Sequence, residues 1–247
     1  MAVYDLIGQG YATHRRPDPR LAEPLWRALG DASLVLNVGA GTGSYEPPPG
    51  MVTTVAVEPS MVMLGQRPPG AGPAVRAVAE ALPCRAGAVD AVMAVLTVHH
   101  WSDPMAGLAE LRRVASRRVV VAYDVALHNS LWLLADYLPV VAEQEERRTL
   151  SVEEIADAIG ADRVEVLPIP HDCTDGLTVA YWRRPEAYLD PEVRACCSGL
   201  ALADQGTVGQ AMSRLAGDLR TGRWHERYGH LTELGQLDLG LRLIVSG

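Results

Sequence analysis

The segment that most constrains the fold of this chain runs from residue 33 to residue 50. SLVLNV (33–38) is a short apolar run of the kind that forms a buried parallel strand, and Gly39, Gly41 and Gly43 follow it at alternate positions. Three consecutive prolines then leave room for at most one turn of helix after this loop. The segment therefore predicts an α/β protein with a binding loop at the carboxyl end of its first strand.

Further apolar runs alternate with helical patterns along the chain. One helix is predicted from Pro19, capped by Asp18, to Gly30, and another begins at Pro104 after its cap Asp103. This alternation is typical of a doubly wound, mostly parallel, seven-stranded Rossmann-like sheet. The strands are expected at 33–38, 53–58, 74–79, 91–96, 118–123, 163–169 and 240–245.

The pattern changes after residue 125. ALHNSLWLLADYLP (126–139) predicts an apolar helix with little polar face, and Ser151 with Glu154 forms a capping box for a helix that ends at Gly160. Because ligands bind at the carboxyl ends of parallel strands, helices inserted beside that edge are placed to cover a substrate. We expect one domain over 1–247, with a cofactor-binding half at 1–125 and helical substrate-covering segments at 126–162 and 170–239.

Composition and charge narrow the classes of function. The net charge of −8 repels the phosphate backbone of nucleic acids, so no nucleic-acid partner is expected. The most apolar stretch, LWLLADYLPVVA, is too short to span a bilayer, so no membrane partner is expected. The spacing of the four cysteines suits neither a disulfide framework nor a zinc site, which indicates reduced thiols, a cytoplasmic location and no metal.

The glycine loop also discriminates between cofactors. A dinucleotide loop has a third glycine that lets its helix pack closely, and that helix binds the pyrophosphate at its N-terminus. Here Ser44 stands at the third position, and the prolines shorten the helix. A cofactor without a pyrophosphate, such as S-adenosylmethionine, fits better. Glu58, at the end of the second strand, would accept hydrogen bonds from both ribose hydroxyls, although a nicotinamide cofactor also needs such a carboxylate and Glu58 could instead cap a helix.

Five motifs follow one another at regular intervals over residues 4–124: VLNVGAGTG, VEPSMVM, AEALP, VDAVMAVLTVHHW and AGLAELRRV. In this order they resemble the class I S-adenosylmethionine-dependent methyltransferases, and more narrowly the type 11 group of small-molecule methyltransferases. The resemblance implies S-adenosylmethionine as cofactor and methyl transfer to oxygen or carbon of a small-molecule acceptor. A non-catalytic S-adenosylmethionine-binding regulator or scaffold remains an alternative, and a nicotinamide-dependent oxidoreductase is a less favoured one. The oligomeric state is not implied.

The resemblance also implies which residues contact the cofactor. The glycines would line its methionine end, Ala79 would offer its backbone amide to the adenine, and Leu96 with Thr97 would flank the sulfonium. Tyr4, Tyr11 and Arg15 would close over the cofactor, with Arg15 suited to the methionine carboxylate. The full expected set is Tyr11, Arg15, Asn37, Gly39, Ala40, Gly41, Gly43, Glu58, Pro59, Ser60, Met61, Ala79, Glu80, Leu96 and Thr97.

Two positions depart from the family pattern. Asn37 stands where the first strand usually ends in an aspartate, which removes a negative charge near the cofactor's ammonium group. Val78 stands where an acid often precedes the adenine-binding alanine, so the usual carboxylate partner of the adenine amino group is missing. Both departures concern single contacts and leave the resemblance intact.

The acceptor and the chemistry are less clearly marked. His99 and His100, at the end of the fourth strand, are the candidate general bases, and at most one of them should face the acceptor because neighbouring side chains diverge. Packing against the sheet is the alternative for either histidine. The candidate acceptor contacts are Trp101, Asp124, Trp132, His171 and Trp182, for which core packing or helix capping is the competing interpretation.

Overall fold

Four short parallel strands form the centre of the molecule. In the computed structural model, which describes residues 4–8, 11 and 15–247, β1 (Leu34–Val38) pairs in parallel with β2 (Thr53–Val57) and β4 (Ala91–Val95). β2 also pairs in parallel with β3 (Ala74–Val75), and β4 pairs in parallel with β5 (Arg117–Tyr123). β9 (Leu241–Ser246) lies antiparallel between β5 and the edge strand β6 (Arg163–Val166). The order β3-β2-β1-β4-β5-β9-β6 confirms the predicted seven-stranded, mostly parallel sheet.

Helices cover both faces of this sheet. On one face lie α5 (Pro104–Val114) and α8 (Val152–Ile159), which pack on Val120 and Ala122 of β5. On the other face lies α3 (Pro19–Ala28), which packs on Val119 and Val121 of the same strand. Alternate residues of one buried strand therefore serve two different cores, as the two-residue period of a strand requires.

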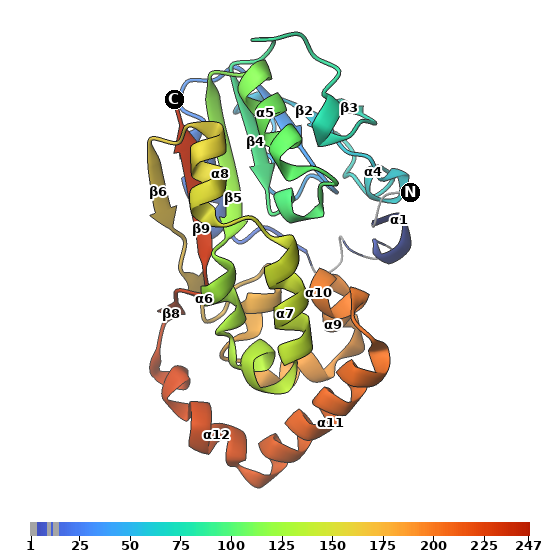
Figure 1. The fold of residues 1–247 in the computed structure, drawn as a ribbon, viewed down its shortest axis with the longest axis vertical. Coiled ribbons are helices and arrows are strands. Elements are labelled where there is room, and N and C mark those ends of the chain that lie inside the picture. Colours follow the sequence, from blue (N-terminus) through green and yellow to red (C-terminus); the bar gives the residue numbers. More distant parts are fainter. Residues whose placement is uncertain (1–3, 9–10, 12–14) are drawn as a thin grey trace.

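A second layer of helices lies below the carboxyl ends of the parallel strands (Figure 1). It shares the core that contains α3, because the same apolar cluster continues from Val119 into Leu133, Trp182 and Leu215. Its helices are α6 (Val125–Asn129), α7 (Pro139–Arg148), α9 (Pro191–Cys196), α10 (Ser198–Leu202), α11 (Gln205–Thr221) and α12 (Arg223–Tyr228), with a π-helical turn at Leu133–Tyr137. The N-terminal helix α1 (Tyr4–Ile7) lies beside α4 (Met61–Leu64).

Capping and turn chemistry agree with the sequence at several boundaries. Asp18 and Asp103 accept hydrogen bonds from the first turns of α3 and α5. The capping box of Ser151 and Glu154 is present, and α8 ends at Gly160 in the left-handed conformation. No helix forms between β1 and β2, because the prolines occupy that connection. Within the described residues, no helix is long and apolar enough to cross a bilayer.

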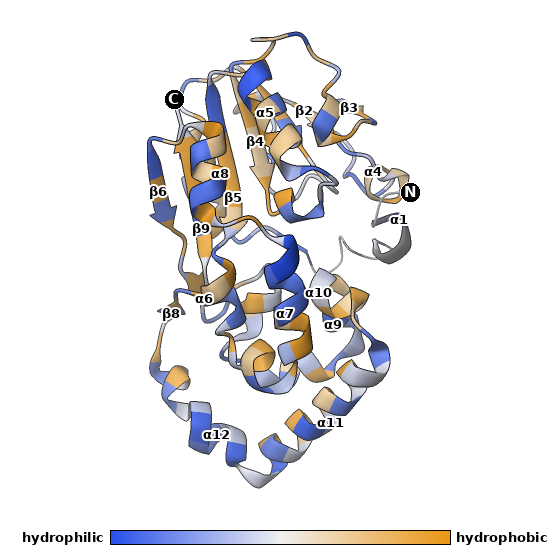
Figure 2. Cartoon of the chain, in the orientation of Figure 1, coloured by the Kyte–Doolittle hydropathy of each residue, from blue (hydrophilic) through white to orange (hydrophobic). Residues whose placement is uncertain are grey.

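Two predicted strands are wrong in extent. The segment 74–79 is extended over only Ala74–Val75, because it lies at the sheet edge where both side chains are exposed, and a 3₁₀ turn occupies Ala79–Ala81. The segment 163–169 is divided between two sheets. All four residues of β6 are exposed at the sheet edge, where hydrophilic residues alternate with valines (Figure 2). β7 (Ile169–Pro170) pairs instead with β8 (Gln236–Leu237). The predicted helix at 126–139 also breaks into α6 and the π-helical turn before Pro139.

Trp132 and Trp182 lie in the core and not at the acceptor. Trp132 is 4% exposed and Trp182 is 0% exposed. The indole N–H of Trp132 donates to the carbonyl of Trp182, and that of Trp182 donates to the carbonyl of Ile169. Trp132 also makes edge-to-face contacts with Tyr188 and Trp224. The prediction that these two tryptophans contact the acceptor is therefore corrected to a packing role.

Truncating Trp182 should mainly destabilise the protein. We expect Trp182→Ala to lower the free energy of unfolding by about 3–5 kcal/mol, because it leaves a cavity and an unpaired carbonyl. Urea denaturation measures this, with the exposed Leu202→Ala (43% exposed) as a control that should change it by less than about 0.5 kcal/mol. Normal stability in the Trp182 variant would contradict the packing role.

Candidate functional site

A cavity of about 670 Å³ opens at the carboxyl ends of β1, β2 and β4. Its volume lies in the range of small-molecule and cofactor sites. Three chain segments form most of its wall: the glycine loop after β1, the turn after β2 and the turn after β4. β2 and β3 lie on one side of β1, and β4 and β5 lie on the other, so the strand order changes direction at β1. In open parallel sheets, ligands bind at the carboxyl ends of the strands beside this switch point.

The backbone of the glycine loop strongly favours glycine at three alternate positions. Gly39, Gly41 and Gly43 have φ values of +69°, +55° and +86°, a region that other residues enter at a cost. A Cβ on Gly39 would lie 2.0 Å from Oγ1 of Thr97, so the loop packs directly on the end of β4. A Cβ on Gly41 would meet only Met63, at 3.2 Å, and Gly41 lines the cavity.

Glu58 is a buried carboxylate at the end of β2, and it is 5% exposed. Its Oε2 accepts a hydrogen bond from the backbone N–H of Gly41 at 2.9 Å, and its Oε1 accepts one from the N–H of Ser60 at 2.8 Å. Burial raises the pKa of Glu58, with the charge of Asp5 as a smaller contribution. The two backbone donors fix the carboxylate at the cavity wall, where further lone pairs can accept hydrogen bonds from ligand hydroxyls.

Asn37 is tied to a neighbouring ion pair. Its side-chain amide donates to Oε1 of Glu46 at 3.2 Å, and Glu46 in turn accepts two hydrogen bonds from Arg67, each at 2.9 Å. The acid missing from the end of β1 thus has a nearby carboxylate substitute, already neutralised by an arginine. Glu46 was not expected from the sequence, since no local pattern connects it to Asn37.

Arg15 lies between the N-terminal segment and the helical layer. Its Nε donates to Oδ1 of Asp175 at 2.6 Å, and the hydroxyl of Tyr45 donates to Oδ2 at 2.6 Å. Tyr11 is a third partner, bonded to Nη1 of Arg15. Asp175 is 1% exposed, so this is a buried ion pair in which both carboxylate oxygens accept hydrogen bonds. Asp175 was missed because its partner is 160 residues away and no sequence pattern marks it.

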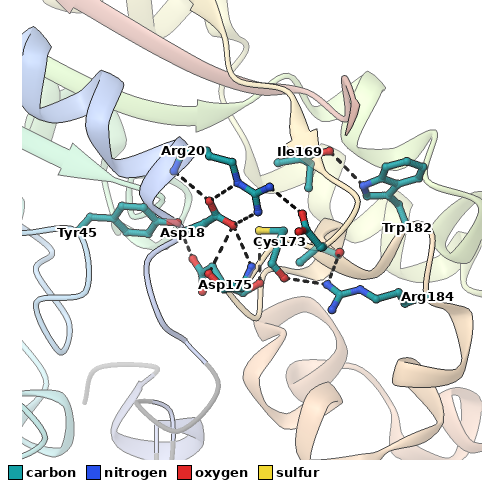
Figure 3. A network of polar contacts seen from close by, with 11 residues as sticks. Asp18, Arg20, Tyr45, Ile169, Cys173, Asp175, Trp182 and Arg184 are labelled. Carbon is teal, nitrogen blue, oxygen red and sulfur yellow. Dashed lines mark hydrogen bonds and ion pairs between the residues drawn. The ribbon is translucent and has the colours of Figure 1, made fainter. Parts of the chain in front are cut away.

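A second set of polar contacts supports this pair (Figure 3). The fully buried Asp18 caps α3, binds Arg20 and accepts a hydrogen bond from the backbone N–H of Thr174, next to Asp175. The guanidinium of Arg184 donates to the carbonyl of Cys173 at 2.8 Å. The loop 170–176 is therefore fastened both to the start of α3 and to the helical layer.

A second cavity, of about 40 Å³, adjoins the first. Four residues line both cavities: Tyr4, Arg15, Leu96 and His100. Leu96 has φ +53°, a strained value for a leucine, and it is the one non-glycine residue with positive φ in the described part of the chain. Strain held at the junction of two cavities is typical of a functional site.

Three histidines line the second cavity and are neutral at pH 7. Burial lowers the pKa of His128 to about 4, and burial together with the charge of Arg15 lowers that of His100 to about 4. The pKa of His99 is also lowered, first by burial and then by the two other histidines. The hydroxyl of Tyr4 lies 3.1 Å from Nε2 of His100. Among the residues that the structure describes, no group of side chains could hold a metal ion.

Comparison with known proteins identifies the family. The methyltransferase domain family matches residues 36–122. A protein of known crystal structure from Anabaena variabilis ATCC 29413, named "Putative methyltransferase from antibiotic biosynthesis pathway", is 33% identical to this chain. The match covers 95% of this chain and 99% of that one, with a TM-score of 0.87. No curated protein matches the chain in sequence.

The chain belongs to the class I S-adenosylmethionine-dependent methyltransferases. It is an enzyme with S-adenosylmethionine as its cofactor, as predicted. Two more distant structures share the fold: the [4+2]-cyclase SpnF (15% identity, TM-score 0.53, covering 98% of this chain and 93% of that one) and geranyl diphosphate C-methyltransferase from Streptomyces coelicolor A3(2) (15% identity, TM-score 0.50, covering 91% and 77%). The nicotinamide-dependent oxidoreductase is dropped as an alternative.

The residues of the methyltransferase cavity fit this cofactor. Among the described residues, a Cβ on Gly41 would meet only the end of the Met63 side chain, so a ligand can approach the backbone there. The carboxylate of Glu58 is held in place at the cavity wall, where it can bind a ribose. Glu80 accepts hydrogen bonds from the N–H groups of Ser102 and Asp103, which closes one end of the cavity. The predicted residues that line it are Tyr11, Arg15, Asn37, Gly39, Ala40, Gly41, Glu58, Pro59, Ala79, Glu80, Leu96, Thr97, His100 and Trp101.

Three predicted cofactor contacts do not line the cavity. Ser60 is fully buried as the cap of α4, and Met61 is 56% exposed on the outside of that helix. Because Gly43 has no side chain, the side chains of Arg67 and Glu46 can pack against its backbone. These residues shape the loops around the cavity, and their contact with the adenine or the methionine end stays a prediction.

The predicted acceptor contacts are distributed over different environments. Trp101 lines the large cavity, with its indole N–H donating to Thr97 and its ring packed against Gly107. Asp124 caps α6, and His171 donates its backbone N–H to Gly235, but neither lines one of the two cavities. For Asp124 and His171 the acceptor contact stays a prediction that neither cavity supports.

Removing the charge of Asp175 should strongly destabilise the enzyme. We expect Asp175→Asn to lower the free energy of unfolding by about 3–5 kcal/mol, because Arg15 is left as an uncompensated buried charge. Asp172→Asn is a matched control: Asp172 pairs with Arg20 at the exposed surface, where an ion pair contributes about 1 kcal/mol or less. Equal effects of the two substitutions in urea denaturation would rule out a special role for Asp175.

The buried histidines should make the protein sensitive to acid. His128 is 7% exposed and has a pKa of about 4 in the folded state against 6.5 when unfolded. Between these values the unfolded chain binds the extra proton, so stability falls as the pH falls. From pH 7 to pH 5 the loss is about 2 kcal/mol for this residue. In urea denaturation, His128→Gln should lose about 2 kcal/mol less unfolding free energy between pH 7 and pH 5 than the wild type does. An equal loss in the two proteins would refute the lowered pKa of His128.

Proposed function

We propose that this methyltransferase methylates an oxygen or carbon atom of a small organic molecule. The observation that carries the proposal is the junction of the two cavities. The large cavity has the features of the cofactor site, and the small one is lined by hydroxyls, imidazoles and a carboxylate that suit a polar acceptor. An acceptor in the small cavity would face the cofactor across Leu96 and His100. The name of the relative from Anabaena variabilis supports a role in small-molecule biosynthesis.

Cofactor binding is assigned to the residues of the large cavity. Glu58 would accept hydrogen bonds from the ribose hydroxyls, and the glycine loop would let the backbone approach the methionine end. Arg15 retains N–H groups beyond those given to Asp175 and Tyr11, and these would donate to the methionine carboxylate. When bound, S-adenosylmethionine supplies a methyl group that is already activated on a sulfonium.

The chain's own chemical task is therefore mainly alignment and the exclusion of water. His100 is the residue that would move a proton, because it lines both cavities and its depressed pKa keeps it neutral. A hydroxyl acceptor becomes strongly acidic as its oxygen gains a methyl group, so even a weakly basic imidazole can accept the proton at that stage. His99 lines only the small cavity and would shape the acceptor site. For a carbon acceptor, both histidines would only position it.

Cofactor binding should depend on the glycine loop and on Glu58. We expect Gly41→Val to abolish S-adenosylmethionine binding measured by calorimetry, because the side chain enters the cavity and strains the loop. Glu58→Gln should weaken it by about 10- to 150-fold, the loss of one or two charge-assisted hydrogen bonds. Circular dichroism checks that both variants fold. Normal affinity in a folded Gly41 variant would show that the cofactor lies elsewhere.

Turnover should depend on His100. The test incubates the enzyme with S-adenosylmethionine and pooled small-molecule extracts, and measures S-adenosylhomocysteine. For a hydroxyl acceptor we expect His100→Gln to reduce turnover by about 10²- to 10⁴-fold with little change in cofactor affinity. His171→Gln, outside both cavities, is the control and should keep normal turnover. Normal turnover of a hydroxyl acceptor by His100→Gln would refute the proton-accepting role of His100.

A further inference from the structure

The second cavity contains a carboxylate without a partner. Glu145 of α7 lines this cavity and is partly buried, yet its side chain forms no hydrogen bond or ion pair with any residue that the structure describes. Burial raises the pKa of Glu145, and the charge of the exposed Arg148 lowers it by a smaller amount. By contrast, the carboxylates of Glu58 and Asp175 are each held by two or more donors. Glu145 is therefore the carboxylate left available to a ligand.

The space around this carboxylate is kept open by a glycine. α10 packs against α7 at this point, and a Cβ on Gly199 of α10 would lie 2.6 Å from Oε1 of Glu145. Any larger residue at 199 would push the carboxylate from its place. Glu145 and Gly199 both line the cavity, so the end of the carboxylate and the cavity wall meet there.

Aromatic rings form much of the remaining wall. The rings of His99 and His100 lie 4.0 Å apart, those of Tyr123 and His128 lie 4.5 Å apart, and Tyr4 packs edge-on against His100 at 5.1 Å. A carboxylate together with electron-rich rings attracts a cation, and a charge-assisted hydrogen bond adds to the attraction. Among the described residues, the cation that lines this cavity is Arg15, and Asp175 compensates its charge.

We propose that Glu145 binds a protonated amino group of the acceptor, so that the substrate class is a small molecule carrying both an ammonium group and an oxygen or carbon nucleophile. This inference rests on the proposed function. The ammonium is a binding handle and not the methylated atom, because a protonated amine has no free electron pair. Glu145 lines only the small cavity, whereas Leu96 and His100 face both, so the handle lies at the end away from the cofactor. A cavity of about 40 Å³ holds only the amino group and its first carbons, and the rest extends toward the large cavity.

The test compares a charged and a neutral probe of the same shape. n-Propylammonium and n-propanol are titrated at pH 7.5 into the full chain saturated with S-adenosylhomocysteine, and binding is followed by NMR. The wild type should bind propylammonium at least about 10-fold more tightly than propanol, and Glu145→Gln should abolish this preference. Gly199→Ala, which displaces the carboxylate, should also reduce it. Glu146→Gln is the matched control, since Glu146 is the exposed neighbour on the same helix, and it should retain the preference.

The same samples separate this inference from the proposed function. The affinity for S-adenosylhomocysteine is measured first, and it should be equal in the wild type and the three variants. Normal cofactor-product binding with no preference for propylammonium, no binding of either probe, or a preference that survives in Glu145→Gln would each overturn the amine handle and leave methyl transfer intact. Failure of the wild type to bind S-adenosylhomocysteine would overturn the proposed function itself.

Discussion

The buried ion pair of Arg15 and Asp175 is the interaction on which the rest of the site depends. It joins two residues that are 160 positions apart: Arg15 at the wall of the large cavity, and Asp175 in the loop that leads into the helical layer. Two buried charges cost several kcal/mol to desolvate, so the arrangement is stable only when every partner is in place. Tyr11 and Tyr45 complete the set of hydrogen bonds. Because Arg15 lines both cavities, this contact fixes a part of the wall that the two cavities share.

The two cavities differ in their electrostatics, and the difference matches their proposed contents. In the large cavity the backbone supplies the donors, which hold Glu58 without a cation, and S-adenosylmethionine brings its own positive charge. In the small cavity, burial lowers the pKa of three imidazoles, and the carboxylate of Glu145 has no hydrogen-bond donor among the described residues. A cationic cofactor and a cationic handle on the acceptor can then occupy neighbouring sites. Leu96, with its positive φ, forms part of the wall that the two cavities share.

The cofactor half could be predicted from the sequence because its signals are local. Each strand is a short apolar run, each helix begins at a capping residue followed by proline, and the glycine loop needs left-handed backbone that glycine supplies. Strand ends converge at one edge of a parallel sheet, so Glu58, Thr97 and His100 could be expected at one site before any contact was known. Ser60, Met61 and Gly43 lie outside the cavity lining, because one turn of backbone decides whether a residue faces the cavity or the surrounding loops.

By itself the sequence determined the fold class, the glycine loop and the family, because these depend on periodicity, capping and backbone conformation within a few residues. Only the tertiary structure decided the acceptor side. Trp132 and Trp182 are residue types that often line acceptor pockets, but here their indole N–H groups donate to backbone carbonyls in the core. Asp175 and Glu145 look like ordinary surface acids in the sequence. Their roles arise from long-range packing, since burial and the presence or absence of a distant partner determine what a carboxylate can bind.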